Sequence, residues 1–136
     1  MANYQVEDVE GIGPAIGQRL RAAGVADTDS LLAASKTPAG RKALAESSGL
    51  SEKQVLKFAN MVDLYRIHGV GSEYAELLEV AGVDTVPELA QRNAENLAKK
   101  LAAVNEAKGL TRRVPAETEV ARWIEEAKTL PRVLEY

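Results

Sequence analysis

The sequence contains no cysteine and few aromatic residues. Without cysteine the chain can form no disulfide, no thiolate zinc or iron–sulfur site and no cysteine nucleophile. Aromatic residues make up 4% of the 136 residues, with one Trp and one Phe. The core must therefore rest on Leu, Val and Ala, which suits closely packed helices, and an apolar content of 46% is enough for a globular fold.

Long apolar runs are also absent. No run approaches the length needed to span a bilayer. Residues 1–10 have neither the basic start nor the apolar stretch of a signal peptide. We therefore expect a cytoplasmic protein with no membrane partner.

The chain has no surplus of basic residues. Its net charge is −3, and residues 1–66 hold 8 Lys or Arg against 8 Asp or Glu, whereas residues 67–136 hold 9 against 12. A dedicated nucleic-acid binder usually carries a basic surplus. This balance counts against strong, salt-driven binding to DNA.

The sequence does contain one short phrase twice. Val9-Glu10-Gly11-Ile12-Gly13 returns as Ile67-His68-Gly69-Val70-Gly71, and the matches continue without a gap at a constant offset of 58. The repeated segment consists of a hydrophobic residue, any residue, glycine, a hydrophobic residue and glycine. Placed before an apolar helix, this pattern is typical of a tight hairpin between two helices. Such hairpins are built around backbone amides.

Helix signals run along the whole chain. Thr37-Pro38 predicts a helix through Ser47 that Gly49 ends, and Ser51–Gln54 and Thr85–Glu88 each have the pattern of a capping box. Pro115 is expected to start a last helix, whose apolar face holds Val120, Trp123, Ile124 and Ala127. No segment alternates apolar and polar residues long enough for a strand. The sequence predicts an all-α fold.

The repeat extends beyond the glycines, since Val55–Ala59 aligns with Val120–Ile124. We therefore place the two halves at residues 1–66 and 67–136. A half of this size buries little core alone. We expect two pseudo-repeated helix-hairpin-helix units packed as one compact globular domain.

The hairpins are the candidate binding sites. Backbone amides at the start of the helix after each hairpin lack helical partners and lie at the positive end of the helix dipole, where a phosphate is stabilised. The candidate nucleic-acid-binding residues are Gly11, Gly13, Ala15, Ile16, Arg19 and Arg21 at the first hairpin and Gly69, Gly71 and Ser72 at the second. The first is favoured, because Glu73 and Glu76 near the second would repel phosphate.

Other interpretations remain open or are set aside. The glycines could serve packing alone, and hairpin carbonyls could hold a monovalent cation. We expect no enzyme, no cofactor and no metal site, because His68 is the only histidine and no His/Cys cluster exists. Glu117, Glu119 and Glu125-Glu126 are interpreted as a solvated helix face.

The chain resembles the helix-hairpin-helix family and, more closely, a bacterial family of two such units known as a domain of unknown function. The resemblance covers almost the whole chain. It rests on Gly11-Ile12-Gly13-Pro14 with Leu20 and Gly24-Val25, on Leu64-Tyr65-Arg66 leading into Gly69-Val70-Gly71, and on Trp123-Ile124 with Ala127-Lys128. It implies a sequence-independent grip on the DNA backbone through the hairpin amides, although Ala15 and Glu73 stand where binders often carry a basic residue. Related units also serve as protein-interaction modules.

We therefore expect a non-enzymatic binding module that holds DNA or RNA backbone weakly through the first glycine hairpin. The alternative is a protein–protein interaction adaptor or scaffold. The acidic second half favours this alternative.

Overall fold

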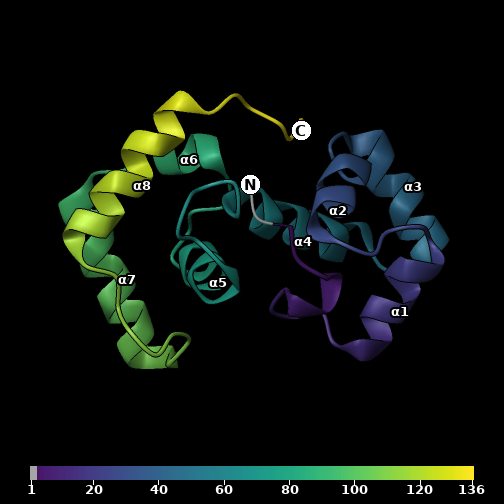
Figure 1. The fold of residues 1–136 in the computed structure, drawn as a ribbon, viewed down its shortest axis with the longest axis horizontal. Helices are drawn as coiled ribbons and strands as arrows, with labels where there is room; N and C mark the ends of the chain where they lie inside the picture. Colours follow the sequence, from purple (N-terminus) through teal and green to yellow (C-terminus); the bar gives the residue numbers. More distant parts are fainter. Residues whose placement is uncertain (1–2) are drawn as a thin grey trace. The chain divides into compact units, whose positions relative to one another are not determined.

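Every regular element is helical in the computed structural model, which describes residues 3–136 (Figure 1). The elements are the 3-10 helix η1 (Val6–Asp8) and the α-helices α1 (Pro14–Ala22), α2 (Thr28–Ala34), α3 (Pro38–Ser48), α4 (Glu52–Leu64), α5 (Ser72–Val80), α6 (Val86–Ala90), α7 (Ala94–Lys108) and α8 (Glu117–Thr129). Within these residues, β pairing is limited to an isolated antiparallel bridge between Gln5 and Asp27. The predicted all-α class is confirmed.

The chain divides into two compact units, and the second is inserted into the first. The first unit comprises residues 3–63 together with Val133–Tyr136, and the second comprises Leu64–Arg132. In the first unit α1 packs against η1 and α3, and α2 packs against α3. In the second unit α8 packs against α6 and α7, and α5 packs against α7. Residues 1 and 2 of the predicted half 1–66 lie outside the described residues.

Two helix starts follow from their local sequence as predicted. The Thr37 hydroxyl accepts the Gly40 N–H at 3.0 Å at the start of α3, and Gly49 ends that helix in the left-handed region at φ 76°. Before α4, the Ser51 Oγ accepts the Gln54 N–H at 3.0 Å while the Gln54 side chain accepts the Ser51 N–H at 3.0 Å. These reciprocal bonds satisfy amides that the helix leaves without partners.

Two other helix starts differ from the sequence prediction. Thr85 is the N-cap of α6, but its side chain makes no capping hydrogen bond. The Glu88 carboxylate, the other half of the predicted box, accepts from Arg92 at 3.0 Å. The last helix begins at Glu117 rather than at Pro115, and the Glu119 side chain accepts the Ala116 N–H at 3.1 Å.

The core of the second unit is mainly aliphatic, and it also contains the buried rings of Trp123 and Tyr65. Trp123 is 1% exposed, and Val120, Ile124 and Ala127 of the same face of α8 are buried with it. The predicted apolar stripe of this helix is therefore correct. Burying a side chain of this size contributes roughly 3 kcal/mol relative to leaving it exposed, and it fixes α8 on the unit.

Candidate nucleic-acid interface

The first glycine hairpin turns the chain into α1. Gly11 has φ +91°, a value that side chains rarely tolerate, and Gly13 is extended as the N-cap of α1. Between them Ile12 is 3% exposed, and its N–H donates to the Val9 carbonyl at 3.0 Å. The Gly17 N–H then donates to the Gly13 carbonyl at 2.9 Å, which starts the helix. One apolar side chain thus anchors the turn while its two glycines stay exposed.

The second hairpin repeats this backbone geometry before α5. Gly69 has φ +89°, and Gly71 is extended as the N-cap. Val70 is 4% exposed, and its N–H donates to the Ile67 carbonyl at 3.1 Å. The Ala75 N–H donates to the Gly71 carbonyl at 2.9 Å. Residues that lie 58 positions apart in the sequence therefore make equivalent hydrogen bonds in the two hairpins.

An aromatic ring from the last long helix of each unit lies against the first glycine of its hairpin. A methyl group at Gly11 would come within 3.4 Å of Cε1 of Phe58 on α4. One at Gly69 would lie 3.6 Å from Nε1 of Trp123 on α8. The sequence alignment of the two halves pairs Phe58 with Trp123. The paired residues therefore make the same contact, each with the first glycine of the hairpin in its own unit.

At the first hairpin, the start of α1 is open. No side chain caps the helix, and its first turn holds no acidic residue. Gly13 and Ala15 are exposed and Ile16 is half-buried. Pro14 has no N–H, so the amides that a ligand could reach lie at the positions after it.

Arg19 and Arg21 were both predicted to support this hairpin, but in the structure they differ in their partners. Arg19 is exposed and forms no ion pair with any described residue. Arg21 instead donates from Nε and Nη2 to the Glu7 carboxylate at 2.9 and 2.7 Å, and from Nη2 to Gln5 at 2.6 Å. The Arg21 hydrogen bond lowers the pKa of Glu7 to about 2, and the same bond raises the pKa of Arg21. Arg19 is thus the cation of α1 available to a ligand.

At the second hairpin, side chains of both charges lie near the backbone. The His68 N–H donates to Glu126 Oε1 of α8 at 3.0 Å, and Glu73 in the first turn of α5 lies 3.8 Å from Arg112. Arg122 of α8 approaches the turn, with Nη2 3.7 Å from the position of a methyl group at Gly69. An acid from the same unit already occupies one donor of this hairpin.

Sequence reasoning missed Arg122 and Glu126 because it considered only residues that follow the glycines along the chain. A signal was nevertheless present. The alignment of the halves pairs Lys57-Phe58 with Arg122-Trp123, and it therefore places a basic residue beside the aromatic residue of each closing helix. If the alignment had been taken to mean that each closing helix lies beside its own hairpin, it would have identified Arg122. Of the predicted second-hairpin residues, Gly69 is exposed, and Gly71 and Ser72 are half-buried.

Trp123 has a polar atom without an acceptor. Its Nε1 is buried and has no hydrogen-bond partner among the described residues. The ring packs on Tyr74 of α5 with 5.3 Å between centroids. A buried N–H without a partner costs free energy, so the ring is held by packing and not by a polar anchor.

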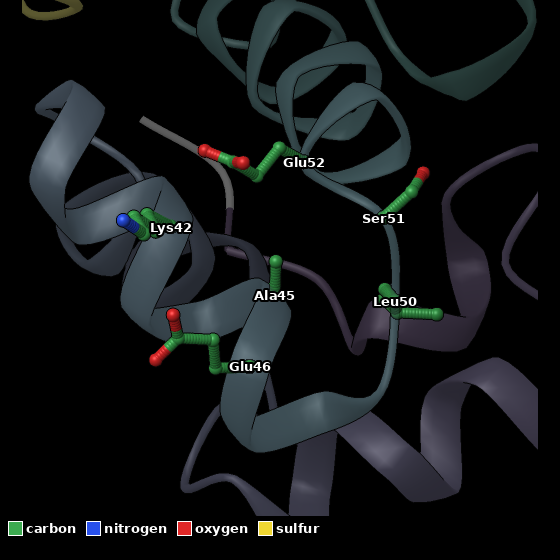
Figure 2. A pocket seen from close by; sticks show the side chains of 6 residues that line it. All are labelled: Lys42, Ala45, Glu46, Leu50, Ser51 and Glu52. Carbon is green, nitrogen blue, oxygen red and sulfur yellow. The ribbon is translucent and has the colours of Figure 1, made fainter.

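A separate surface hollow lies in the first unit, where α3 ends and α4 begins (Figure 2). It has a volume of about 280 Å³ and is open to solvent. Lys42, Glu46 and Glu52 bring charges of both signs to its wall, and Ala45 and Leu50 are the apolar lining. Two carboxylates against one ammonium do not favour a phosphate there, and none of the candidate hairpin residues lines it.

Neither a metal-binding cluster nor a membrane-spanning helix is found in residues 3–136. No three His, Cys, Asp or Glu side chains of this range come together to hold an ion. No helix of the described part is long and apolar enough to cross a bilayer.

Comparison with known proteins gives a family but no characterised relative. No curated protein and no solved structure matches the chain. The sequence model of DUF4332, a domain of unknown function, matches residues 10–130, and the chain therefore belongs to this family.

Proposed function

We propose that the chain is built of two helix-hairpin-helix units and that the first binds nucleic-acid backbone weakly, without sequence preference. The matched hairpins support the repeat. In both, a buried aliphatic residue lies between two glycines, and an aromatic ring lies against the first glycine. The helices after both hairpins also end alike, with Gly24 at φ +88° and Gly82 at φ +95°.

The uncapped start of α1 is the observation on which the binding proposal depends. Its amides after Pro14 are at the positive end of the helix dipole, no carboxylate lies in its first turn, and Gly13 and Ala15 are exposed. A phosphate oxygen is an acceptor that suits such donors. Arg19, on the same helix, adds a positive charge that no described carboxylate neutralises.

Weak binding is expected because few charges take part. Each phosphate contact made by a cation contributes to affinity through counterion release. The helix after the first hairpin offers one such cation, Arg19 in its last turn, since Arg21 is bound to Glu7. The second hairpin adds little, because Glu73 and Glu126 oppose a phosphate there.

Fluorescence anisotropy tests the proposal. Labelled mixed-sequence duplex and single-stranded oligonucleotides are titrated with protein at low and moderate salt. We expect binding at low salt that weakens steeply as salt rises, with a similar affinity for unrelated sequences. Absence of binding at low salt would overturn the proposal.

Two matched pairs of variants locate the site. Arg19→Gln removes the free cation of α1, whereas Lys108→Gln makes the same charge change on α7. We expect Arg19→Gln alone to weaken binding and to reduce the salt slope by about one. Equal effects of the two variants would mean that net charge, and not the hairpin, sets the affinity.

The second pair places a carboxylate at the amides. Ala15→Glu puts an acid in the first turn of α1, where it stabilises the helix and repels a phosphate. Ala103→Glu makes the same change on the exposed face of α7. We expect only Ala15→Glu to abolish binding, with no loss of thermal stability.

The alternative is a protein-interaction adaptor, and the acidic second hairpin favours it. Glu73 and Glu126 beside that turn suit a basic partner surface better than a phosphate. A chain that binds no nucleic acid at low salt, and whose association with a basic protein weakens in Glu73→Gln, would support this alternative.

A further inference from the structure

The glycine at position 69 leaves a small space beside the second hairpin. A methyl group at Gly69 would lie within 4 Å of two atoms outside the neighbouring residues, Trp123 Nε1 at 3.6 Å and Arg122 Nη2 at 3.7 Å. Both are hydrogen-bond donors, and neither is an acceptor. An oxygen atom that enters this space therefore meets one donor from an indole and one from a guanidinium.

The indole N–H is the first reason to expect an acceptor in this space. Trp123 is 1% exposed, and its Nε1 has no hydrogen-bond partner among residues 3–136. A buried donor without a partner costs free energy, which an incoming oxygen atom recovers. The ring packs on Tyr74 in the first turn of α5, and the N-cap of that helix, Gly71, has no side chain to cap it. The donor is thus held at an open helix start.

Arg122 is the second reason, and it favours an anionic acceptor. The residue is exposed and forms no ion pair with a carboxylate of the described chain. A guanidinium hydrogen-bonds most strongly to an oxygen that carries negative charge. Because Gly69 is exposed as well, movement of the arginine side chain gives a ligand access to the space from solvent.

The first hairpin lacks this pair of donors, although its backbone is the same. The corresponding point beside Gly11 is 3.4 Å from Cε1 of Phe58, a carbon atom that donates no conventional hydrogen bond. No other described side chain outside the neighbouring residues lies within 4 Å of that point. The donors beside Gly69 are therefore a property of the second unit, where Trp123 replaces Phe58, and not of the hairpin backbone.

We propose that the space beside Gly69 binds a carboxylate group, with one oxygen at Trp123 Nε1 and the other at Arg122. The turn already binds a carboxylate, since Glu126 accepts the His68 N–H at 3.0 Å. The two oxygens of a carboxylate match two adjacent donors, and its single charge matches that of the arginine. Glu126 opposes the larger charge that inorganic phosphate carries at neutral pH. This inference does not depend on nucleic-acid binding.

Because the chain has a single tryptophan, NMR observes the site directly. In a uniformly ¹⁵N-labelled chain, Trp123 gives the one indole N–H signal. The chain is titrated with sodium acetate at neutral pH and constant ionic strength, and sodium chloride is the reference. We expect acetate to move the indole proton signal to lower field until the site is saturated. A response to acetate no larger than that to chloride would overturn the proposal, and equal or tighter binding of inorganic phosphate would overturn the assignment to a carboxylate.

Two matched pairs of variants locate the binding. Arg122→Gln and Lys108→Gln each remove one exposed positive charge, and we expect only Arg122→Gln to weaken acetate binding severalfold. Gly69→Ala fills the space, whereas Gly11→Ala places a methyl group at a similar φ, +91° against +89°, in the other unit. We expect only Gly69→Ala to abolish the response of the indole signal. Equal effects within the arginine–lysine pair would overturn the proposal even if Gly69→Ala did not fold, because Arg122→Gln changes an exposed side chain.

Discussion

The two glycine hairpins have the same backbone and differ in the charges at the start of the following helix. In each, the first glycine has φ near +90° and the second is an extended N-cap. The first opens a helix with no acid in its first turn, whereas the second has Glu73 in that turn and a carboxylate of Glu126 bound to the His68 N–H. Backbone geometry follows from the glycines, whereas the charge around each turn is set by side chains that include Glu126 of α8.

At the second hairpin, an acid of the same unit satisfies a backbone donor of the turn. Glu126 lies on α8, far along the chain from His68, and it accepts the amide at 3.0 Å. A carboxylate and a phosphate oxygen are both anionic acceptors, so the same donor can serve either. The comparison shows that one amide of the second hairpin is satisfied by an acid of its own unit, whereas no side chain caps the helix after the first.

The largest expected effect concerns the rings beneath the hairpins. Trp123→Ala and Phe58→Ala should each cost about 3–5 kcal/mol of unfolding free energy, because each removes a buried ring. Urea unfolding followed by circular dichroism measures the cost. A loss near that of an exposed substitution would show that the ring does not support its hairpin.

Smaller changes at the same positions distinguish the two rings. Trp123→Phe deletes the Nε1 that has no acceptor, so its cost should stay within about 1 kcal/mol because relief of the unpaired donor offsets the lost volume. Phe58→Leu removes no polar atom and should cost about 1–2 kcal/mol. A greater loss for Trp123→Phe would mean that the indole N–H has an acceptor in solution.

The next effect tests the shared backbone. Gly11→Ala and Gly69→Ala place a side chain at φ +91° and +89°, which should cost about 1–2 kcal/mol each. Gly13→Ala and Gly71→Ala are matched controls, since both positions have negative φ and open space around them. In the same unfolding assay we expect these controls to be nearly neutral. Equal losses at all four glycines would contradict the described geometry.

Local sequence predicted the features that depend on local interactions. The capping bonds of Thr37 and Ser51 join residues three apart, and both helices begin where the pattern places them. At Thr85 the predicted capping bond does not form, and the Glu88 carboxylate accepts from Arg92 one turn later. A competing charge does not by itself prevent capping, because Glu119 is bound by Arg113 and still accepts the Ala116 N–H.

The surroundings of the hairpins could not be predicted because they depend on tertiary contacts. Arg21 was predicted beside a phosphate, but Glu7 binds it across α1 at a point where Gly17 leaves room for the Glu7 side chain. Glu126 reaches His68 from a helix that follows much later in the chain. A single sequence gives the positions of these charges along the chain, and folding decides which of them meet.

A further prediction concerns removal of the acids beside the second hairpin, which makes its charge more like that of the first. Glu73→Gln with Glu126→Gln removes both acids from the turn, and the affinity for an oligonucleotide at low salt should rise roughly twofold to fivefold. Glu95→Gln with Glu125→Gln makes the same change in charge at two exposed acids, each paired with a lysine. Anisotropy titrations compare the two double variants. Equal gains would show that total charge, and not the turn, limits binding.

The smallest effect concerns pH, and there the two units are alike. Hydrogen bonds from Arg21 and Arg113 lower the pKa of Glu7 and Glu119 from 4.5 to about 2. A lowered pKa in the folded state stabilises the fold fully above pH 4.5, and this contribution is lost as the pH falls towards 2. Glu7→Gln and Glu119→Gln should therefore lower the melting temperature slightly at neutral pH.

The same two variants should approach the wild type as the pH falls from 4.5 towards 2, because the carboxyls that they replace become protonated there. Thermal melts at a series of pH values measure the difference. Glu106→Gln is the control, since Glu106 is exposed and forms no ion pair with a described residue. A difference that stayed constant down to pH 2 would show that the glutamine side chains disturb packing. The stability assigned to the two ion pairs would then have to be withdrawn, because protonation of a paired carboxyl must remove it.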